Sequence, residues 1–273
     1  MLKTDDLLKN VTKLPPSSTA SVKLLTLLNE DASSSEIGRV IETDPSLTAQ
    51  VIRLANTPYY GMSRRVASAR QAVMVLGFDL VRSLVTNAAF GFNVGRSSGV
   101  PEGFWEHSLS SGAAASVLAV HSGYPESEAF SAGLLADLGI ALLYRYLGPA
   151  YTKLRERAAS LEQPLIAAEQ EEFGMTHADI TAAALERMRF PEELVTVLGR
   201  HHVVPDETTS PLGRIVFAAE ALAHEFEHTR PEGHLGVTAA LEAAGFEPVM
   251  VPQLLEAIGR DYESFAGLLV GAA

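Results

Sequence analysis

The sequence predicts an all-α protein, and three observations lead to this prediction. Apolar residues recur at helical spacing through most of the chain, and no long stretch alternates between apolar and polar residues with a period of two. Helix-starting and helix-ending signals, such as Asp44-Pro45 and Gly77, separate the apolar segments. With 273 residues, of which 47% are hydrophobic, the chain can bury a substantial core in one large or two small domains.

The N-terminal elements are expected to follow one another as short helices. Residues 22–28 give an apolar helical face, and Ser34 or Ser35 can cap the next helix. Asp44-Pro45 predicts another helix start, because a capping Asp followed by Pro at the first helical position leaves no needed donor unbonded. A helix is then expected over 69–76, with a turn at Gly77 and a further helix toward residue 90.

The glycines and small residues of 91–103 indicate a boundary between two helical parts. We therefore expect a two-part helical bundle, with one helical half over residues 1–95 and the other over 96–273, including a C-terminal helical extension. In the second half a long Ala-rich helix should follow Trp105, which we expect in the core. Later helices are expected over 150–160, 164–173, 177–185 and from Pro191 to His201-His202, with a closing helix in 248–273.

The composition and net charge limit the partners and the cellular location that we expect for this protein. Lys and Arg number 21 and Asp and Glu 33, which gives a net charge of −12 and argues against nucleic-acid and anionic-membrane partners. The chain has no cysteine, so disulfides and thiolate metal sites are excluded. Residues 1–6 carry acids where a signal peptide needs basic residues, and no uninterrupted apolar run reaches the roughly 18 residues of a membrane helix. We expect a cytoplasmic protein.

The segment Gly133-Leu-Leu-Ala-Asp-Leu-Gly139 places one charge, Asp137, in a strongly apolar run. Burying an Asp is costly unless it is paired, hydrogen-bonded or bound to a metal, so Asp137 is either a ligand or a structural acceptor.

This segment resembles the Gly-Leu-Leu-His-Asp-Ile-Gly stretch of the HD phosphohydrolase superfamily, except that the metal-binding His is Ala136. The resemblance is closer to the HDOD family, whose members look like HD domains that have lost part of the ligand set. The segments 44–56 and Ala72-Val-Met-Val-Leu-Gly77 also resemble this family. The resemblance implies a bacterial signal-transduction module with partners such as kinases and cyclic-dinucleotide enzymes.

Carried over residue by residue, the resemblance aligns His107 with the first His of the HD pattern, Asp137 with its Asp, and Glu220 with its last Asp. Some HD relatives have additional metal ligands, and these fall near His177, His201 and His202 of this sequence. We expect a vestigial pocket without a metal, a cofactor or a catalytic residue, because losing a ligand weakens the grip needed to activate water. The expected pocket consists of His107, Ala136, Asp137, His177, His201, His202 and Glu220.

Two readings of this pocket remain: a weak metal site of His107, Asp137 and Glu220 with His201 or His202, and a polar remnant in which His107 and Asp137 hydrogen-bond each other. Because adjacent residues of a helix point in different directions, at most one of His201 and His202 is expected to face the pocket.

His224-Glu225-Phe-Glu-His228 fits the zinc metallopeptidase pattern, and His234 falls where the extended form of that motif has its third ligand. However, Pro231 stands where the extended motif has Gly, and the φ of proline is restricted to about −65°. The strands of a peptidase fold are also not expected.

Arginines are the main basic feature of the N-terminal half. They could contact a phosphate-bearing ligand or an acidic partner, or form a solvated face. The candidates are Arg53, Arg64, Arg65 and Arg70.

The leading hypothesis is a non-catalytic signalling module that binds another protein of a signalling pathway. The alternatives are a residual metal-dependent phosphohydrolase using His107, Asp137 and Glu220, a nucleotide or cyclic-dinucleotide sensor using Arg64, Arg65 or the pocket, and a zinc metallopeptidase. An exposed apolar face on the C-terminal helix would make it a homodimer or partner surface.

Overall fold

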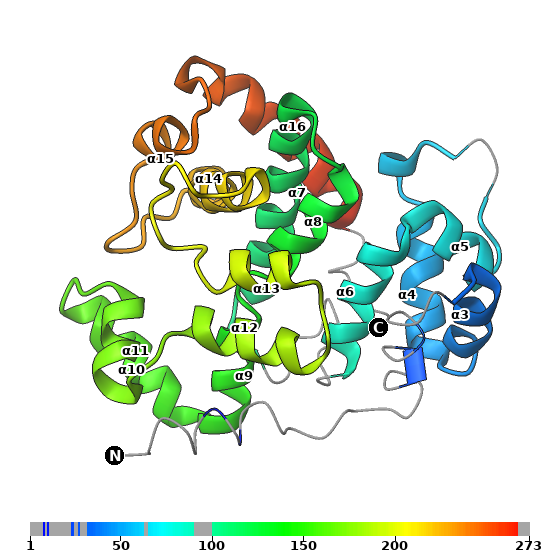
Figure 1. The fold of residues 1–273 in the computed structure, drawn as a ribbon, viewed down its shortest axis with the longest axis horizontal. Coiled ribbons are helices and arrows are strands. Elements are labelled where there is room, and N and C mark those ends of the chain that lie inside the picture. The colour runs from blue at the N-terminus through cyan, green and yellow to red at the C-terminus, as the bar shows by residue number, and fades with distance from the viewer. Residues whose placement is uncertain are drawn as a thin grey trace. The chain divides into compact units, whose positions relative to one another are not determined.

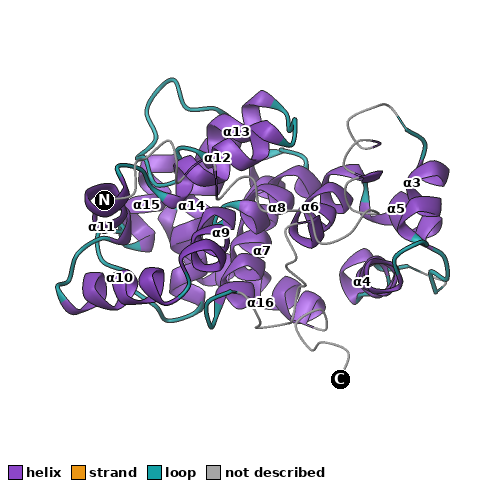
Figure 2. Ribbon diagram, turned by 90° about the horizontal axis from the view of Figure 1, so that it is seen from below, coloured by secondary structure: helices purple, strands orange, loops and turns teal. Residues whose placement is uncertain are grey.

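In the computed structural model of the chain, the described residues are 32–62, 65–89 and 100–266, with a few isolated positions before residue 32. Every regular element in these ranges is a helix (Figure 1), and the second view shows no strand among them (Figure 2). The all-α prediction is therefore confirmed. The chain divides into two compact units, one of residues 15–97 with 259–273 and the other of 1–14 with 98–258.

The described part of the first unit is a set of short helices packed on α5. Its elements are α3 (Ser34–Ile41), α4 (Pro45–Ala55), the 3-10 helix η1 (Pro58–Tyr60), α5 (Ala69–Leu76) and α6 (Phe78–Ala89). Helix α5 contacts α3, α4 and α6. Gly38 makes the α3 contact possible, because a Cβ there would lie 2.8 Å from the backbone of Arg70.

Caps define where these helices begin. Ser33, rather than Ser34 or Ser35, caps α3 in a reciprocal capping box with Glu36. As expected, Asp44 caps α4, accepting a hydrogen bond from the backbone N–H of Leu47 at 3.1 Å. The helix expected over 22–28 lies outside the continuously described residues.

The second unit contains the longer helices. In chain order they are α7 (Phe104–Ser122), α8 (Glu126–Leu135), α9 (Leu138–Leu147), α10 (Pro149–Ser160), α11 (Leu165–Phe173), α12 (His177–Arg187), α13 (Glu192–Leu198), α14 (Pro211–Phe226), α15 (Val237–Ala244), the 3-10 helix η2 (Pro248–Met250) and α16 (Val251–Ala266). Helix α16 continues past residue 258 and so contributes to both units.

The core of this unit forms around α7, which packs on α8 and α14, while α12 packs on α9 and α13. Trp105 is 3% exposed, which confirms its expected place in the core. Small residues allow close helix contact: a Cβ on Gly133 of α8 would lie 2.5 Å from the Ser111 carbonyl oxygen of α7.

The apolar segment around Asp137 is not one continuous helix. Helix α8 ends at Leu135 and α9 begins at Leu138, and Asp137 between them has φ −95° and ψ 16°. By length and composition, residues 126–147 could cross a membrane, but 72% of their apolar window is buried inside the protein. The segment is a core element of the helical unit.

The closing helix α16 has an apolar face, on which Leu254 is 1% exposed and Ile258 fully buried. These two side chains therefore pack on the core, as expected. The residues expected to extend this face beyond 266 lie outside the described part of the chain.

Candidate functional site

Four side chains of the second unit, from three separate segments, bring ligand atoms to one point. Asp137, His177, His201 and His202, here called the Asp137 quartet, each offer one such atom, all within 4.8 Å of one another. Nε2 of His177 lies 2.8 Å from Nε2 of His202 and 3.3 Å from Oδ1 of Asp137, and Nε2 of His201 lies 3.6 Å from the same oxygen.

The break between α8 and α9 places Asp137 in this centre, and the start of α12 supplies His177. Gly139 permits the two to meet, because a Cβ at that position would collide with the His177 carbonyl oxygen. Thr181 fixes the contact: its hydroxyl donates to the Ala136 carbonyl at 3.1 Å and accepts from the Gly139 N–H at 2.8 Å.

Two buried residues orient His177 from behind, and sequence reasoning did not identify either. Glu169 of α11, fully buried, accepts from both the backbone N–H and the Nδ1 of His177 at 2.8 Å. Tyr151 of α10, also fully buried, donates its hydroxyl to the other oxygen of Glu169 at 2.5 Å. Because Nδ1 faces the carboxylate, Nε2 of His177 faces the quartet.

Both adjacent histidines face the centre, so the expectation that at most one would do so was wrong. Helix α13 ends at Leu198, and His201 and His202 lie in the turn that follows, where the angular spacing of a helix does not apply. Their ring centroids lie 4.0 Å apart. Nδ1 of His201 donates to the Leu198 carbonyl at 2.7 Å, which directs its Nε2 at the quartet.

Burial and neighbouring charges shift the pKa values of three members of the quartet in opposing ways. Burial and the Glu220 charge favour the neutral acid, yet the neighbouring His177 and His201 rings hold the pKa of Asp137 well below its ordinary value. Burial disfavours a charged ring, but the carboxylates of Glu169 and Asp137 raise the pKa of His177 to about 10. For His202, burial and the two other histidines of the quartet lower the pKa well below its ordinary value.

A second group of side chains, here called the His107 cluster, lies next to the quartet and consists of His107, Glu220, His224 and Glu227. Oε1 of Glu220 lies 3.1 Å from Nε2 of His107 and 3.2 Å from Nε2 of His224. The other ring nitrogen of His107 lies 3.1 Å from Glu227. Glu227 also accepts from Ser110, and His224 Nδ1 lies 2.8 Å from the Thr229 hydroxyl.

The two ring nitrogens of His107 both face carboxylates, so this cluster holds a charged imidazolium. Burial opposes that charge, but Glu220, Glu227 and Asp137 raise the pKa of His107 well above its ordinary value. Burial likewise opposes the Glu220 carboxylate, but His107 and His224 lower the pKa of Glu220 well below its ordinary value. The His107 cluster therefore satisfies its own charges.

Asp137 connects the two groups, because its Oδ1 faces the quartet while its Oδ2 lies 3.4 Å from Nε2 of His107. A small cavity of about 60 Å³ borders both groups and is lined by His201, His202, Glu220, Glu232 and His234 together with apolar residues. Burial lowers the pKa of His234, whose ring lies 5.1 Å from that of His224 and 5.2 Å from that of His202.

The structure brings together all six polar residues of the expected pocket: His107, Asp137, His177, His201, His202 and Glu220. Ala136, 2% exposed, contributes its carbonyl and no side-chain ligand. Arg53, Arg65 and Arg70 belong to the other unit, and Arg64 lies outside the described residues.

The His-Glu-x-x-His segment does not form the single helical turn that a zinc peptidase motif requires. Helix α14 ends at Phe226, and His228 lies beyond it, exposed and with φ 56°. His224 instead joins the His107 cluster, and this geometry does not support the zinc-metallopeptidase alternative.

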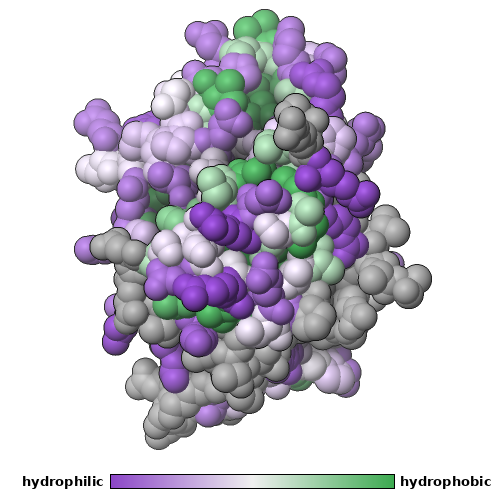
Figure 3. All heavy atoms as spheres, turned by 90° about the vertical axis from the view of Figure 1, so that its right-hand side faces the viewer, coloured by the Kyte–Doolittle hydropathy of each residue, from purple (hydrophilic) through white to green (hydrophobic). Residues whose placement is uncertain are grey.

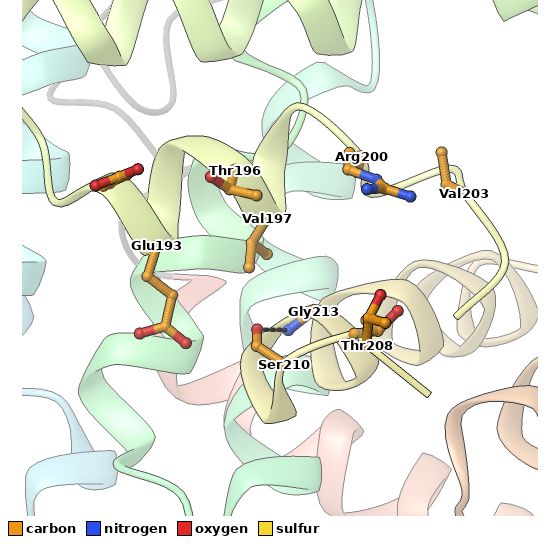
Figure 4. Close-up of a pocket in the computed structure, with 10 residues that line it drawn as sticks. Glu193, Thr196, Val197, Arg200, Val203, Thr208, Ser210 and Gly213 are labelled. Carbon is orange, nitrogen blue, oxygen red and sulfur yellow. Dashed lines mark hydrogen bonds between the residues drawn. The ribbon is translucent and has the colours of Figure 1, made fainter. Parts of the chain in front are cut away.

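A larger cavity of about 370 Å³ lies on the other side of the histidine turn. It is bordered by α13, by the turn carrying Arg200 and Val203, and by the start of α14 (Figure 4). Ser210 caps α14 there, because its hydroxyl accepts a hydrogen bond from the backbone N–H of Gly213. Sequence reasoning did not identify this cavity. None of the six polar pocket residues lines it.

The donor set of the quartet fits a metal ion. Oδ1 of Asp137 and Nε2 of His201 are buried without a hydrogen-bond partner among the described residues, which is rare for polar atoms in a protein interior. Imidazole nitrogens with one carboxylate oxygen are typical ligands of Zn²⁺ and of Fe²⁺. The His107 cluster, by contrast, is already hydrogen-bonded.

Comparison with solved structures shows the same fold. An HDOD domain protein of unknown function from Geobacter sulfurreducens is 22% identical with a TM-score of 0.72, and 97% of this chain and 96% of that chain are covered. A candidate signal-transduction protein from Marinobacter aquaeolei VT8 is 25% identical with a TM-score of 0.73, and 97% of this chain and 61% of that chain are covered.

A curated relative, an uncharacterized protein of Treponema pallidum (strain Nichols), is 25% identical over 179 residues, which are 65% of this chain. The match spans only 35% of that relative's length. The HDOD domain family matches residues 14–204, a range that includes α3 to α13 and all four residues of the Asp137 quartet. The chain therefore belongs to the HDOD family.

Proposed function

We propose that this chain is a non-catalytic signalling module that acts by binding another protein. The observation that carries the proposal is an exposed apolar surface on the unit containing α3 to α6. Met74 of α5 is 68% exposed and Phe78 of α6 is 46% exposed. They stand four positions apart in the sequence, and large exposed apolar side chains gathered in one segment are typical of protein interaction sites.

The charge next to this surface favours an acidic partner. Arg70 is exposed and precedes Met74 by one helical turn on α5, so the two side chains share a helix face. On the face drawn in Figure 3, hydrophobic areas are interspersed with hydrophilic residues. A few apolar anchors with an arginine beside them are the pattern of a specific interface.

The alanine at position 136 supports a non-catalytic role. A phosphohydrolase metal must lower the pKa of a bound water to about 7, and this requires a well-held ion with an open coordination position. Ala136 removes the imidazole that would accompany Asp137 in the HD pattern.

The test uses the intact protein and two surface variants. The wild type is cross-linked in a lysate of the cells that produce it, beside Met74→Ser/Phe78→Ser and the matched control Val249→Ser, whose site is 78% exposed on the other unit. We expect a defined signalling protein to be captured by the wild type and by Val249→Ser, and lost with the double variant. Equal capture by all three proteins would contradict the proposal.

A second candidate is metal-dependent phosphoester hydrolysis, because Nε2 of His107 lies 3.4 Å from Oδ2 of Asp137 and 3.1 Å from Oε1 of Glu220. Turnover of a phosphomonoester and phosphodiester panel with Mn²⁺ or Fe²⁺ separates the candidates. We expect no turnover by the wild type, and Ala136→His tests whether the missing imidazole restores it. Turnover by the wild type that Asp137→Asn abolishes would favour the enzyme.

A further inference from the structure

We propose that the 370 Å³ cavity between α13 and the start of α14, here called the α13 cavity, binds a short zwitterionic peptide of about two or three residues in extended form. Glu193 would hold the ammonium group of the peptide and Arg200 its carboxylate. None of the residues that line the α13 cavity belongs to the Asp137 quartet or to the His107 cluster. The inference also does not depend on protein binding by the other unit.

One side of the cavity is a single face of α13, with opposite charges at its two ends. Glu193, Thr196 and Val197 stand three and four positions apart and so share a helix face. Arg200 continues this series in the turn after α13, where its N–H donates to the Val197 carbonyl at 3.1 Å. Glu193 and Arg200 lie at opposite ends of the cavity, with Thr196 and Val197 between them (Figure 4).

The opposite side of the cavity is a turn that side-chain hydrogen bonds hold in place. Asp206 accepts from the backbone N–H of Thr208 at 2.9 Å and from the hydroxyls of Thr208 and Thr209 at 2.7 and 3.1 Å. Arg214 of α14 donates to the backbone carbonyls of Asp206 and Thr209. The cavity is therefore largely preformed, as small-ligand sites usually are.

The middle of the cavity combines a narrow apolar floor with hydroxyl groups. Gly213 lies opposite Val197, because a Cβ at Gly213 would be 3.7 Å from Cγ2 of Val197. The hydroxyl of Ser210 accepts from the Gly213 N–H at 3.2 Å, and its own proton has no acceptor among the described residues. The exposed Thr196 hydroxyl likewise has no hydrogen-bond partner among them. Both hydroxyls can donate to a ligand.

The spacing of these groups matches a peptide with free ends. Glu193 and Arg200 are seven positions apart, which corresponds to about 10 Å along a helix that rises 1.5 Å per residue. An extended chain advances about 3.3–3.6 Å per residue, so two or three residues place an ammonium and a carboxylate at this separation. Between these ends, the hydroxyls of Thr196 and Ser210 can donate to peptide carbonyls, and Val197 offers an apolar contact.

The charge of the cavity argues against a nucleotide or another polyanion. Glu192 and Glu193 line it with a single arginine, Arg200, so the lining carries a charge of +1 − 2 = −1. A phosphate group would bring further negative charge next to two carboxylates. A zwitterion instead pairs its ammonium with the two acids and its carboxylate with the guanidinium, and such charge-assisted hydrogen bonds are the strong ones.

The test uses the full chain and trialanine, a simple zwitterionic peptide of this length, in proton–nitrogen NMR titrations. We expect saturable binding with shifted amide signals at Thr196 and Gly213. Acetylating the N-terminus or amidating the C-terminus of the peptide should each lower the affinity about 5- to 10-fold, because each change removes one charged contact.

Two variants assign these contacts to their residues. Glu193→Gln should lower the affinity for trialanine by the same factor as acetylation, but should not change the affinity for the acetylated peptide. Arg200→Gln should show the same relation to the amidated peptide. Thr196→Phe, at an exposed position, fills the cavity without changing its charge and should abolish binding.

Matched controls change charges outside the cavity. Glu207→Gln in the neighbouring turn and Arg187→Gln on α12, both at exposed positions, should bind trialanine as the wild type does. Circular dichroism checks that every variant folds. The Met74→Ser/Phe78→Ser variant should also bind trialanine, so this test and the capture experiment can fail separately.

Three results would overturn the assignment. The first is a wild type that does not bind trialanine, and the second is equal affinity for the peptide blocked at both ends. The third is unchanged binding of trialanine by Glu193→Gln and Arg200→Gln. Binding only of longer blocked peptides would point to a segment of a partner protein, and would contradict a site for free peptides.

Discussion

The Asp137 quartet and the His107 cluster contain the same kinds of side chain but satisfy them differently. In the His107 cluster, each ring nitrogen of His107 faces a carboxylate, and Glu220 receives contacts from two histidines. In the quartet, three imidazoles share one carboxylate, and Oδ1 of Asp137 and Nε2 of His201 lack hydrogen-bond partners among the described residues. The His107 cluster is therefore a hydrogen-bonded ion-pair network, whereas the quartet leaves two buried polar atoms unsatisfied among the described residues.

The two groups also differ in their access to water. Side-chain exposure is 16% for His107 and 20% for Glu227, whereas it is 2% for His177 and 0% for Glu169. Water can compensate a disturbed contact in the His107 cluster. The quartet and its supports must be satisfied by the protein or by an ion, so substitutions there should be the more damaging.

The largest expected effect is that of Glu169→Ala. Removing one partner of a buried charged pair typically costs about 3–5 kcal/mol, because the remaining groups stay buried and unpaired. Here Tyr151 and His177 would both lose their acceptor. Glu227→Ala, in the more exposed cluster, should cost about 1 kcal/mol or less. Urea unfolding followed by circular dichroism measures both, and equal losses would remove the proposed distinction.

A smaller loss is expected from Gly139→Ala. The added methyl collides with the His177 carbonyl oxygen, and overpacking of this kind costs about 1–3 kcal/mol. The collision should displace the start of α12 and the His177 side chain with it. Gly236→Ala is the control, since its Cβ would meet nothing within 4 Å. A Gly139→Ala protein with unchanged stability would show that this contact does not position His177.

The dependence of the unfolding free energy on pH, measured at acidic pH in metal-free protein, tests both groups together. The pKa values of Asp137 and Glu220 lie well below the ordinary 3.8 and 4.5. A carboxyl whose pKa is lower in the folded state contributes stability above its unfolded pKa and loses it as the pH falls through its folded pKa. We therefore expect the free energy of unfolding to fall as the pH is lowered below about 4.5.

The comparison for this curve is Glu220→Gln, which removes one of the two carboxylates. Its unfolding free energy, measured from pH 7 to pH 3 with chelator present, should depend less steeply on pH than that of the wild type. An equally steep curve would mean that the His107 imidazolium does not lower the pKa of Glu220.

The smallest effect is expected from His224→Gln. Glutamine can still donate a hydrogen bond toward Glu220, and the side chain of His224 is 15% exposed. A net change of about 1 kcal/mol or less in unfolding free energy is expected from losing one hydrogen bond near water. A change above about 2 kcal/mol would show that the His107 cluster is as sensitive as the quartet.

Much of the fold could be predicted from the sequence because local signals decide it. The cap at Asp44, the helix over 69–76 and the apolar face with Leu254 and Ile258 all lie where residue patterns predicted them. Asp137 could be identified because a single charge in an apolar run needs a partner. Its role as the break between α8 and α9 could not, because apolar periodicity continues on both sides of it.

The rest of the site depends on contacts between distant segments. Glu169 stands among Glu and Gln residues on α11, and nothing in the sequence separates a buried acid from its exposed neighbours. His201 and His202 converge only because α13 ends three residues earlier than expected, at Leu198. The zinc-like spacing of His224 and His228 gave a misleading signal, since the helix ends between them.

The two oxygens of Asp137 face different neighbours, and this has a thermodynamic consequence. His177 contacts the Oδ1 side and His107 the Oδ2 side. Linkage then requires that a proton on either ring change the proton affinity of the other ring by the same factor. The protonation states of the two histidines are thus coupled through a single carboxylate.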